Sequence, residues 1–137
     1  MTFEIQERER EGIAIFDVAG RLIVGMSSGS LRDRVQAHVN SGKTNIVLNL
    51  TRVDYIDSTG LGALVLCYRV AQTAGGALKL LNLNRRELEL LVLTKLTQVF
   101  DIFNDEQDAL NSFYPDREIK HFDILSFIRQ TREEEGM

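Results

Sequence analysis

The 137-residue sequence contains few of the residues that build disulfide frameworks, metal centres and interdomain linkers. Its single cysteine, Cys67, excludes an internal disulfide, and we therefore expect a reducing, cytoplasmic environment. The only histidines, His38 and His121, are scattered relative to Cys67, so we expect no metal site. There is one proline and no stretch rich in glycine, serine and proline, which predicts one domain without an internal linker.

The sequence also lacks a surplus of basic residues and a long apolar run. Its 16 lysines and arginines are outnumbered by 20 aspartates and glutamates, and the net charge of −4 argues against direct binding of nucleic acid. The longest hydrophobic stretches, such as 61–68, are much shorter than the ~20 residues of a membrane-spanning helix. The first residues lack the apolar core of a signal peptide. We therefore expect no membrane span.

The hydrophobic pattern predicts strands that alternate with helices. Short apolar or alternating runs predict strands at 3–6, 13–18, 46–50, 78–83 and 99–103. Apolar positions at helical spacing predict helices around 31–39, 61–71, 88–96 and 109–113. Asn84, followed three residues later by Glu87, predicts a capping box at the start of the third of these helices. We expect a charged hairpin turn at 8–12 and a loop at 53–57. This order predicts an α/β fold, in which helices pack on a mixed, mostly parallel sheet of about five strands within residues 1–114.

Residues 115–137 form a C-terminal extension that contains a dense apolar cluster. Six large apolar residues lie within ten positions, namely Ile119, Phe122, Ile124, Leu125, Phe127 and Ile128. Spacings of three between four of them predict a helix, although the six do not form one clean stripe. A solvated tail is normally poor in such residues. We therefore expect an extra helical segment that packs on its own domain or across a homodimer.

The segment from Asp57 to Gly62 combines a helix start with several small residues. One interpretation is ordinary capping, in which Asp57 or Ser58 accepts hydrogen bonds from backbone N–H groups, and Gly60 and Gly62 allow close packing. Each glycine, however, costs about 1 kcal/mol of helix propensity relative to alanine. This cost favours a flat surface that admits another molecule. The hydroxyl of Ser58 would be accessible to a kinase at such an exposed helix start.

Enzyme motifs are absent from the sequence. There is no Walker-type phosphate loop, the run 60–62 lacks the third glycine of a dinucleotide fingerprint, and no Gly-x-Ser-x-Gly elbow occurs. Cys67 lies in an apolar helical stretch and is expected to be a buried hydrophobic residue. An esterase with Ser58 as its nucleophile would need a nearby general base. Nucleotide binding would have only the anion affinity of a helix start to support it. We therefore predict a non-enzyme without a cofactor.

Three parts of the sequence together carry a family resemblance. The run 46–50, the run 53–62 with its Asp-Ser-Thr-Gly-Leu-Gly segment, and the pair Gly75-Gly76 occur in this order. With these features the sequence resembles the STAS domain of bacterial anti-sigma factor antagonists. The resemblance covers about residues 3–113, and residues 57–62 are its most specific part.

The resemblance implies a function by partner switching. An unphosphorylated antagonist of this family binds an anti-sigma factor that is also a serine kinase, and thereby frees the sigma factor. The kinase phosphorylates the serine that matches Ser58, and a phosphatase restores it. Ser58 is the expected phosphoacceptor, with Thr59 as a less favoured neighbour. The residues expected to bind the partner are Asp57, Ser58, Thr59, Gly60, Leu61, Gly62 and Ile23.

The sequence departs from the family pattern at Ile23. Members active in partner switching often carry an aspartate shortly after the glycine of the second strand, and here that stretch is Gly-Arg-Leu-Ile at 20–23. The alternative function is a STAS-like adaptor that holds a transport complex or signalling scaffold together and is never phosphorylated. Ile23 favours the adaptor, whereas the intact run 57–59 favours the phosphoregulated antagonist.

Overall fold

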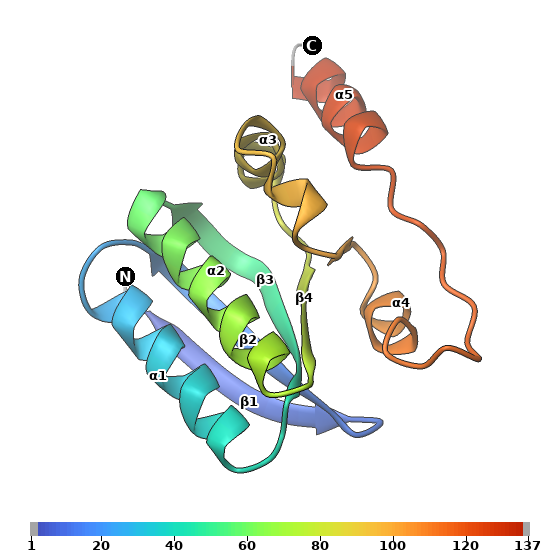
Figure 1. The fold of residues 1–137 in the computed structure, drawn as a ribbon. Helices are drawn as coiled ribbons and strands as arrows, with labels where there is room; N and C mark the ends of the chain where they lie inside the picture. The colour runs from blue at the N-terminus through green and yellow to red at the C-terminus, as the bar shows by residue number, and fades with distance from the viewer. Residues whose placement is uncertain (1–2, 136–137) are drawn as a thin grey trace.

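The computed structural model describes residues 3–135, which form five helices, one 3-10 turn and one five-stranded sheet (Figure 1). The elements in chain order are β1 (Glu4–Arg10), β2 (Ile13–Leu22), α1 (Met26–Asn40), β3 (Asn45–Ile56), α2 (Ser58–Thr73), β4 (Ala77–Leu81), α3 (Arg85–Leu93), the 3-10 turn η1 (Leu96–Gln98), β5 (Ile102–Phe103), α4 (Glu106–Asn111) and α5 (Ile124–Glu135).

The sheet has the strand order β1-β2-β3-β4-β5. Only the β1–β2 pair is antiparallel, and the other neighbours run parallel. The predicted α/β fold with a mixed, mostly parallel sheet is therefore confirmed. Because β2, β3 and β4 run parallel, their carboxyl ends meet at one edge of the sheet, and in open α/β sheets this edge is where ligands bind.

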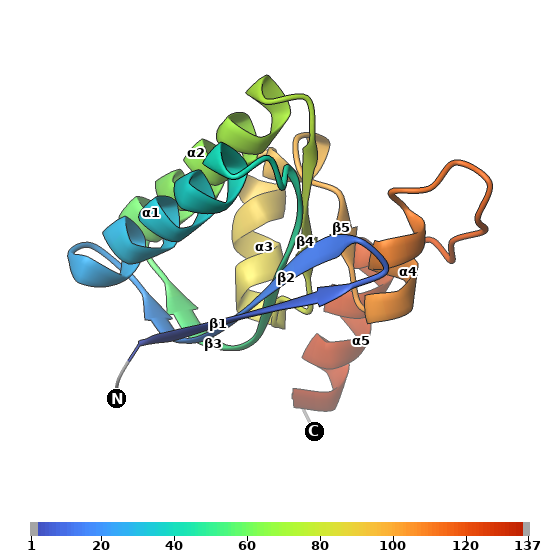
Figure 2. The same ribbon diagram turned by 90° about the horizontal axis from the view of Figure 1, so that it is seen from below.

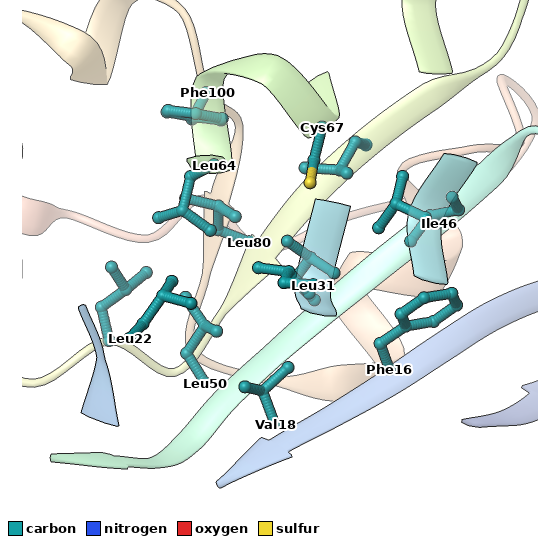
Figure 3. Packing of buried hydrophobic residues seen from close by; sticks show 14 of the residues in the cluster. Phe16, Val18, Leu22, Leu31, Ile46, Leu50, Leu64, Cys67, Leu80 and Phe100 are labelled. Carbon is teal, nitrogen blue, oxygen red and sulfur yellow. The ribbon is translucent and has the colours of Figure 1, made fainter. Parts of the chain in front are cut away.

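The larger hydrophobic core lies between the sheet and helices α1, α2 and α3. Phe16, Ile46 and Leu80 of the strands are fully buried there together with Leu31 of α1 and Leu64 of α2 (Figure 3). Burying each such side chain contributes about 1.5–3 kcal/mol relative to exposure. This core fixes α1 and α2 against the sheet.

A smaller core covers the other face of the sheet. Its buried residues are Ile13, Ile15, Val47, Leu81, Phe103, Ala109 and Leu110. Figure 2 shows α1 and α2 on one side of the sheet and α4 on the other. The alternation of side chains along β2 and β3 therefore supplies both cores, as expected of strands covered on two faces.

Several predicted boundaries are wrong. Residues 53–56 are the end of β3 and not a loop, because Val53 and Tyr55 pair with Gly20 and Arg21 of β2. The charged residues 8–10 pair with β2 as well, so the hairpin turn is only two residues long. The strand expected at 99–103 consists of Ile102 and Phe103 alone, and the predicted end of α3 is instead the turn η1.

The C-terminal extension contains a helix, as predicted, but the helix begins at Ile124, after Ile119 and Phe122. Half-buried Phe122, Ile124, Phe127 and Ile128 pack against the larger core. Arg132 of α5 donates to Glu89 of α3 at 2.7 Å. The extension thus packs on its own chain, while a homodimer and the domain boundary at residue 114 remain predictions.

Candidate functional site

Asp57 fixes the start of α2 against the end of β2. Its Oδ1 accepts a hydrogen bond from the backbone N–H of Gly60 at 2.8 Å, and its Oδ2 accepts one from Val24 at 2.9 Å. Its own backbone N–H donates to the carbonyl oxygen of Leu22 at 3.2 Å. The N–H groups of Gly60 and then Val24 lower the pKa of Asp57 below its usual value. One carboxylate thus caps the helix and ties it to the β2–α1 loop.

Gly60 and Gly62 have different environments. A Cβ atom on Gly60 would lie 2.1 Å from the carbonyl oxygen of Leu22, so this glycine allows α2 to approach the backbone of β2. A Cβ atom on Gly62 would meet nothing within 4 Å, and this residue is exposed. Gly60 therefore has the packing role, whereas Gly62 belongs to an open surface.

Ser58 and Thr59 are exposed in the first turn of α2. The hydroxyl of Ser58 makes no hydrogen bond to another residue within 3–135, so the fold does not occupy it. Leu61 is 9% exposed and belongs to the larger core. Of the predicted binding residues, Ser58, Thr59 and Gly62 can touch a partner directly, while Gly60 and Leu61 position the helix. Their part in binding remains a prediction.

Ile23 lies beside this helix start in the β2–α1 loop. Its backbone N–H donates to the hydroxyl of Ser27 at 2.9 Å, and its carbonyl oxygen accepts from Ser28 at 2.6 Å. These bonds hold the loop against the start of α1, where Val24 of the loop is 68% exposed and Met26, the first residue of α1, is 90% exposed. Sequence reasoning missed these two apolar residues, although two exposed apolar side chains around Gly25 are a usable signal for a contact surface.

A groove of about 610 Å³ is lined by Ser58 and by other residues from the end of β3, the start of α2 and α3. Figure 1 shows that α2 begins at the edge of the sheet where β3 ends. Helix α3 lies beside the same edge. The groove is lined by acidic and apolar side chains, among them Asp54, Tyr55, Leu61, Glu87, Glu89, Leu90 and Leu93. Sequence reasoning missed the contribution of α3, because it identified only the capping box at Asn84 and Glu87, which the structure confirms.

The geometry around Ser58 does not favour nucleophilic catalysis. His38 packs edge-to-face on Phe16 with ring centroids 5.1 Å apart, and His121 lines a different cavity, near α4 and α5. Asp57 uses both carboxylate oxygens as acceptors for backbone N–H groups, and its lowered pKa makes it a poor base. Neither histidine nor Asp57 therefore provides Ser58 with the general base that a serine nucleophile requires.

The one cysteine is buried, as predicted. Cys67 is 1% exposed and points into the larger core (Figure 3), and burial raises the pKa of its thiol to about 12.

Within residues 3–135, no three or more His, Cys, Asp and Glu side chains gather in an arrangement that could hold a metal ion. None of the helices in the same range has both the length and the apolar composition that crossing a membrane requires.

Comparison with known proteins identifies the family to which the chain belongs. The family model for the STAS domain matches residues 4–109. The chain belongs to the STAS domain family. This STAS domain is 31% identical over 102 residues to the anti-sigma-B factor antagonist of Bacillus subtilis (strain 168), in an alignment covering 74% of this chain and 92% of that protein.

Solved structures share the fold of this STAS domain. A candidate anti-sigma factor antagonist from Thermotoga maritima superposes with a TM-score of 0.75 at 23% identity, covering 80% of this chain and 93% of that one. The Bacillus cell fate determinant SpoIIAA in its phosphorylated form superposes with a TM-score of 0.63 at 19% identity, covering 81% and 98%. The family match ends at residue 109, so α5 lies beyond it.

Proposed function

We propose that the chain is an anti-sigma factor antagonist that is switched by phosphorylation of Ser58. The observation that carries this proposal is the exposed, unoccupied hydroxyl of Ser58 in the first turn of α2, next to exposed Thr59 and one helical turn before exposed Gly62. Similarity to anti-sigma factor antagonists supports it, and SpoIIAA is a protein of the same fold that has been described in a phosphorylated form.

The unphosphorylated surface offers a partner exposed apolar side chains and an exposed glycine. Val24 is exposed in the β2–α1 loop and Met26 at the first residue of α1, while Gly62 and the 44%-exposed Leu66 continue the face of α2 that begins at Ser58. Exposed apolar side chains around a flat region are typical of a docking surface. The anti-sigma factor would bury these side chains and cover the serine hydroxyl.

Phosphorylation would act on this surface and not on the fold. A phosphate adds about −1.5 to −2 charges and three acceptor oxygens. At the start of a 16-residue helix, the helix dipole and unpaired N–H groups favour this anion. A docked partner would instead have to desolvate it beside the carboxylate of Asp57. The proposed output is therefore release of the anti-sigma factor, which acts as the kinase, while a phosphatase resets Ser58.

Phosphopeptide mass spectrometry tests the proposed phosphoacceptor directly. The full chain is incubated with ATP, magnesium and the anti-sigma factor kinase that binds it, in parallel with Ser58→Ala and Thr59→Ala. We expect one phosphate on Ser58 in the wild type and in Thr59→Ala, and none in Ser58→Ala. Phosphate on another residue with Ser58 unmodified would refute the assignment.

A STAS adaptor that is never phosphorylated is the second candidate function. The observation that favours it is Ile23 in the loop beside α2. Its side chain is apolar, whereas members of the family that switch partners often have an aspartate at this position. Under this function, Ser58→Glu and the wild type would bind the partner equally well, and the kinase incubation above would leave the chain unmodified.

A further inference from the structure

Glu87 lines the groove between α2 and α3 and has a carboxylate oxygen without a hydrogen-bond partner among the described residues. The residue is 4% exposed, and its Oε1 accepts from the backbone N–H of Asn84 at 3.1 Å in the capping box of α3. Its Oε2 is buried and has no hydrogen-bond partner among the described residues. Buried polar atoms in native proteins are almost always paired, so an orphaned carboxylate oxygen in a groove points to a donor that arrives with a ligand.

The charges around Glu87 favour a cationic donor. Asp57 and Glu89 also line the groove, but Asp57 is held by backbone N–H groups and Glu89 by Arg85 and Arg132. Among the described residues that line the groove, this leaves Asp54 of β3 and Glu87 of α3 as the acidic groups without a basic partner, and Arg86 as the one arginine.

The acidic surroundings of the groove also affect the proton affinity of Glu87. Burial, and to a smaller extent the charge of Asp54, raises the pKa of Glu87 to about 7. The groove therefore favours a positive charge or a proton at this position. A cationic ligand would displace the proton and leave the carboxylate ionised.

The walls of the groove match the stem of a long basic side chain. Tyr55, Leu61, Leu90 and Leu93 provide apolar surface, and Leu93, which lines the same groove as Glu87, is 80% exposed. An arginine combines three methylene groups, which pack on apolar surface, with a guanidinium group that has five N–H donors. A lysine offers only a point charge on a strongly hydrated ammonium group.

We propose that the groove between α2 and α3 receives an arginine side chain from the anti-sigma factor, with the orphaned Oε2 of Glu87 accepting a hydrogen bond from its guanidinium group. This inference rests on the proposed function for the identity of the partner. Ser58 lines the same groove, so a partner segment that inserts this arginine would also contact the start of α2 at Ser58. Recognition by the groove and control by phosphate then act on one continuous surface.

A small-molecule probe tests the groove without any partner protein. The full-length, ¹⁵N-labelled chain is titrated with n-butylguanidinium chloride, with neutral n-butylurea, and with sodium chloride at matched ionic strength. At about pH 8, where Glu87 is ionised, we expect saturable shifts of the amide signals of Leu61, Glu87 and Leu90 with the guanidinium probe alone. No saturable shifts in the groove, shifts elsewhere, or equal binding of the urea would overturn the proposal.

Two variants assign the binding to Glu87. Glu87→Gln keeps a carbonyl oxygen for the capping box and removes the charge, so the helix should remain. We expect it to weaken probe binding at least about tenfold, the loss expected for a charge-assisted hydrogen bond. Glu133→Gln removes an exposed carboxylate from α5 and should bind the probe like the wild type. Equal binding by Glu87→Gln would refute the role of Glu87.

Binding to the anti-sigma factor separates this inference from the proposed function. An anti-sigma factor that binds the wild type and Glu133→Gln equally should bind Glu87→Gln at least about tenfold more weakly. Full affinity of Glu87→Gln would overturn the groove proposal and leave the Ser58 switch intact. If no anti-sigma factor binds the wild type, the proposed function fails, and the probe titration still decides whether the groove takes a guanidinium group.

Discussion

Replacing Gly60 and Gly62 separately by alanine tests the description of the helix start. In Gly60→Ala the new methyl carbon would lie 2.1 Å from the carbonyl oxygen of Leu22, whereas ordinary contacts begin at 3.4 Å. The start of α2 must therefore move by about 1 Å, which strains the hydrogen bonds of Asp57 to Gly60 and Val24. Overpacking of this kind costs about 1–3 kcal/mol, and occasionally more.

Gly62→Ala is the matched control, because its methyl carbon would meet nothing within 4 Å. It should gain up to about 1 kcal/mol of helix propensity. Urea unfolding followed by circular dichroism measures both free energies of unfolding. At roughly 3–5 °C per kcal/mol for a domain of this size, Gly60→Ala should lower the melting temperature by roughly 3–15 °C, and Gly62→Ala should leave it unchanged or raise it. Equal stability of Gly60→Ala and the wild type would refute the close approach of α2 to β2.

Four further predictions follow from the same structure. Asp57→Ala should lower the free energy of unfolding at neutral pH; because the folded pKa of Asp57 is lowered, this deficit should shrink in urea titrations as the pH falls below 3.8. Glu87 has a raised folded pKa, so between pH 4.5 and about 7 the wild type should lose stability relative to Glu87→Gln as the pH rises, and the difference should then level off; a flat difference would contradict its burial. A chain ending at Tyr114 lacks α5 and should melt at a lower temperature, because α5 packs on α3 of the same chain. Light scattering should give the same number of chains per particle as for the full chain; an unchanged melting temperature would contradict this packing. Gly62→Arg should weaken binding of the anti-sigma factor in calorimetry while keeping the wild-type melting temperature; a loss of fold would show that the site is not open.

Local chemistry made part of the site predictable from the sequence. An aspartate before a helix start is a strong capping signal, and the structure confirms both this cap and the capping box at Asn84. Residues two apart on a helix point to opposite sides, so Gly60 and Gly62 had to face different surroundings. Which of them faces the sheet depends on the contact with Leu22, and this contact is set by the packing of α2 on the core.

Features that depend on distant contacts were not predictable. The end of β3 was mistaken for a loop because Asp54 and Tyr55 are polar or exposed, and only pairing with β2 makes this stretch a strand. Glu87 was predicted as a capping residue, but its burial follows from the position of α3 beside the end of β3. The groove combines residues from 54–61 and 86–94, which no local pattern connects.

The most direct test of the central claim is the affinity of the anti-sigma factor for the unphosphorylated and the Ser58-phosphorylated chain. Isothermal titration calorimetry measures both affinities, and thermal unfolding of the two forms controls for an effect on the fold. We predict at least about tenfold weaker binding of the phosphorylated chain, with a melting temperature close to that of the unphosphorylated chain. Equal affinity of the two forms would contradict the proposed switch.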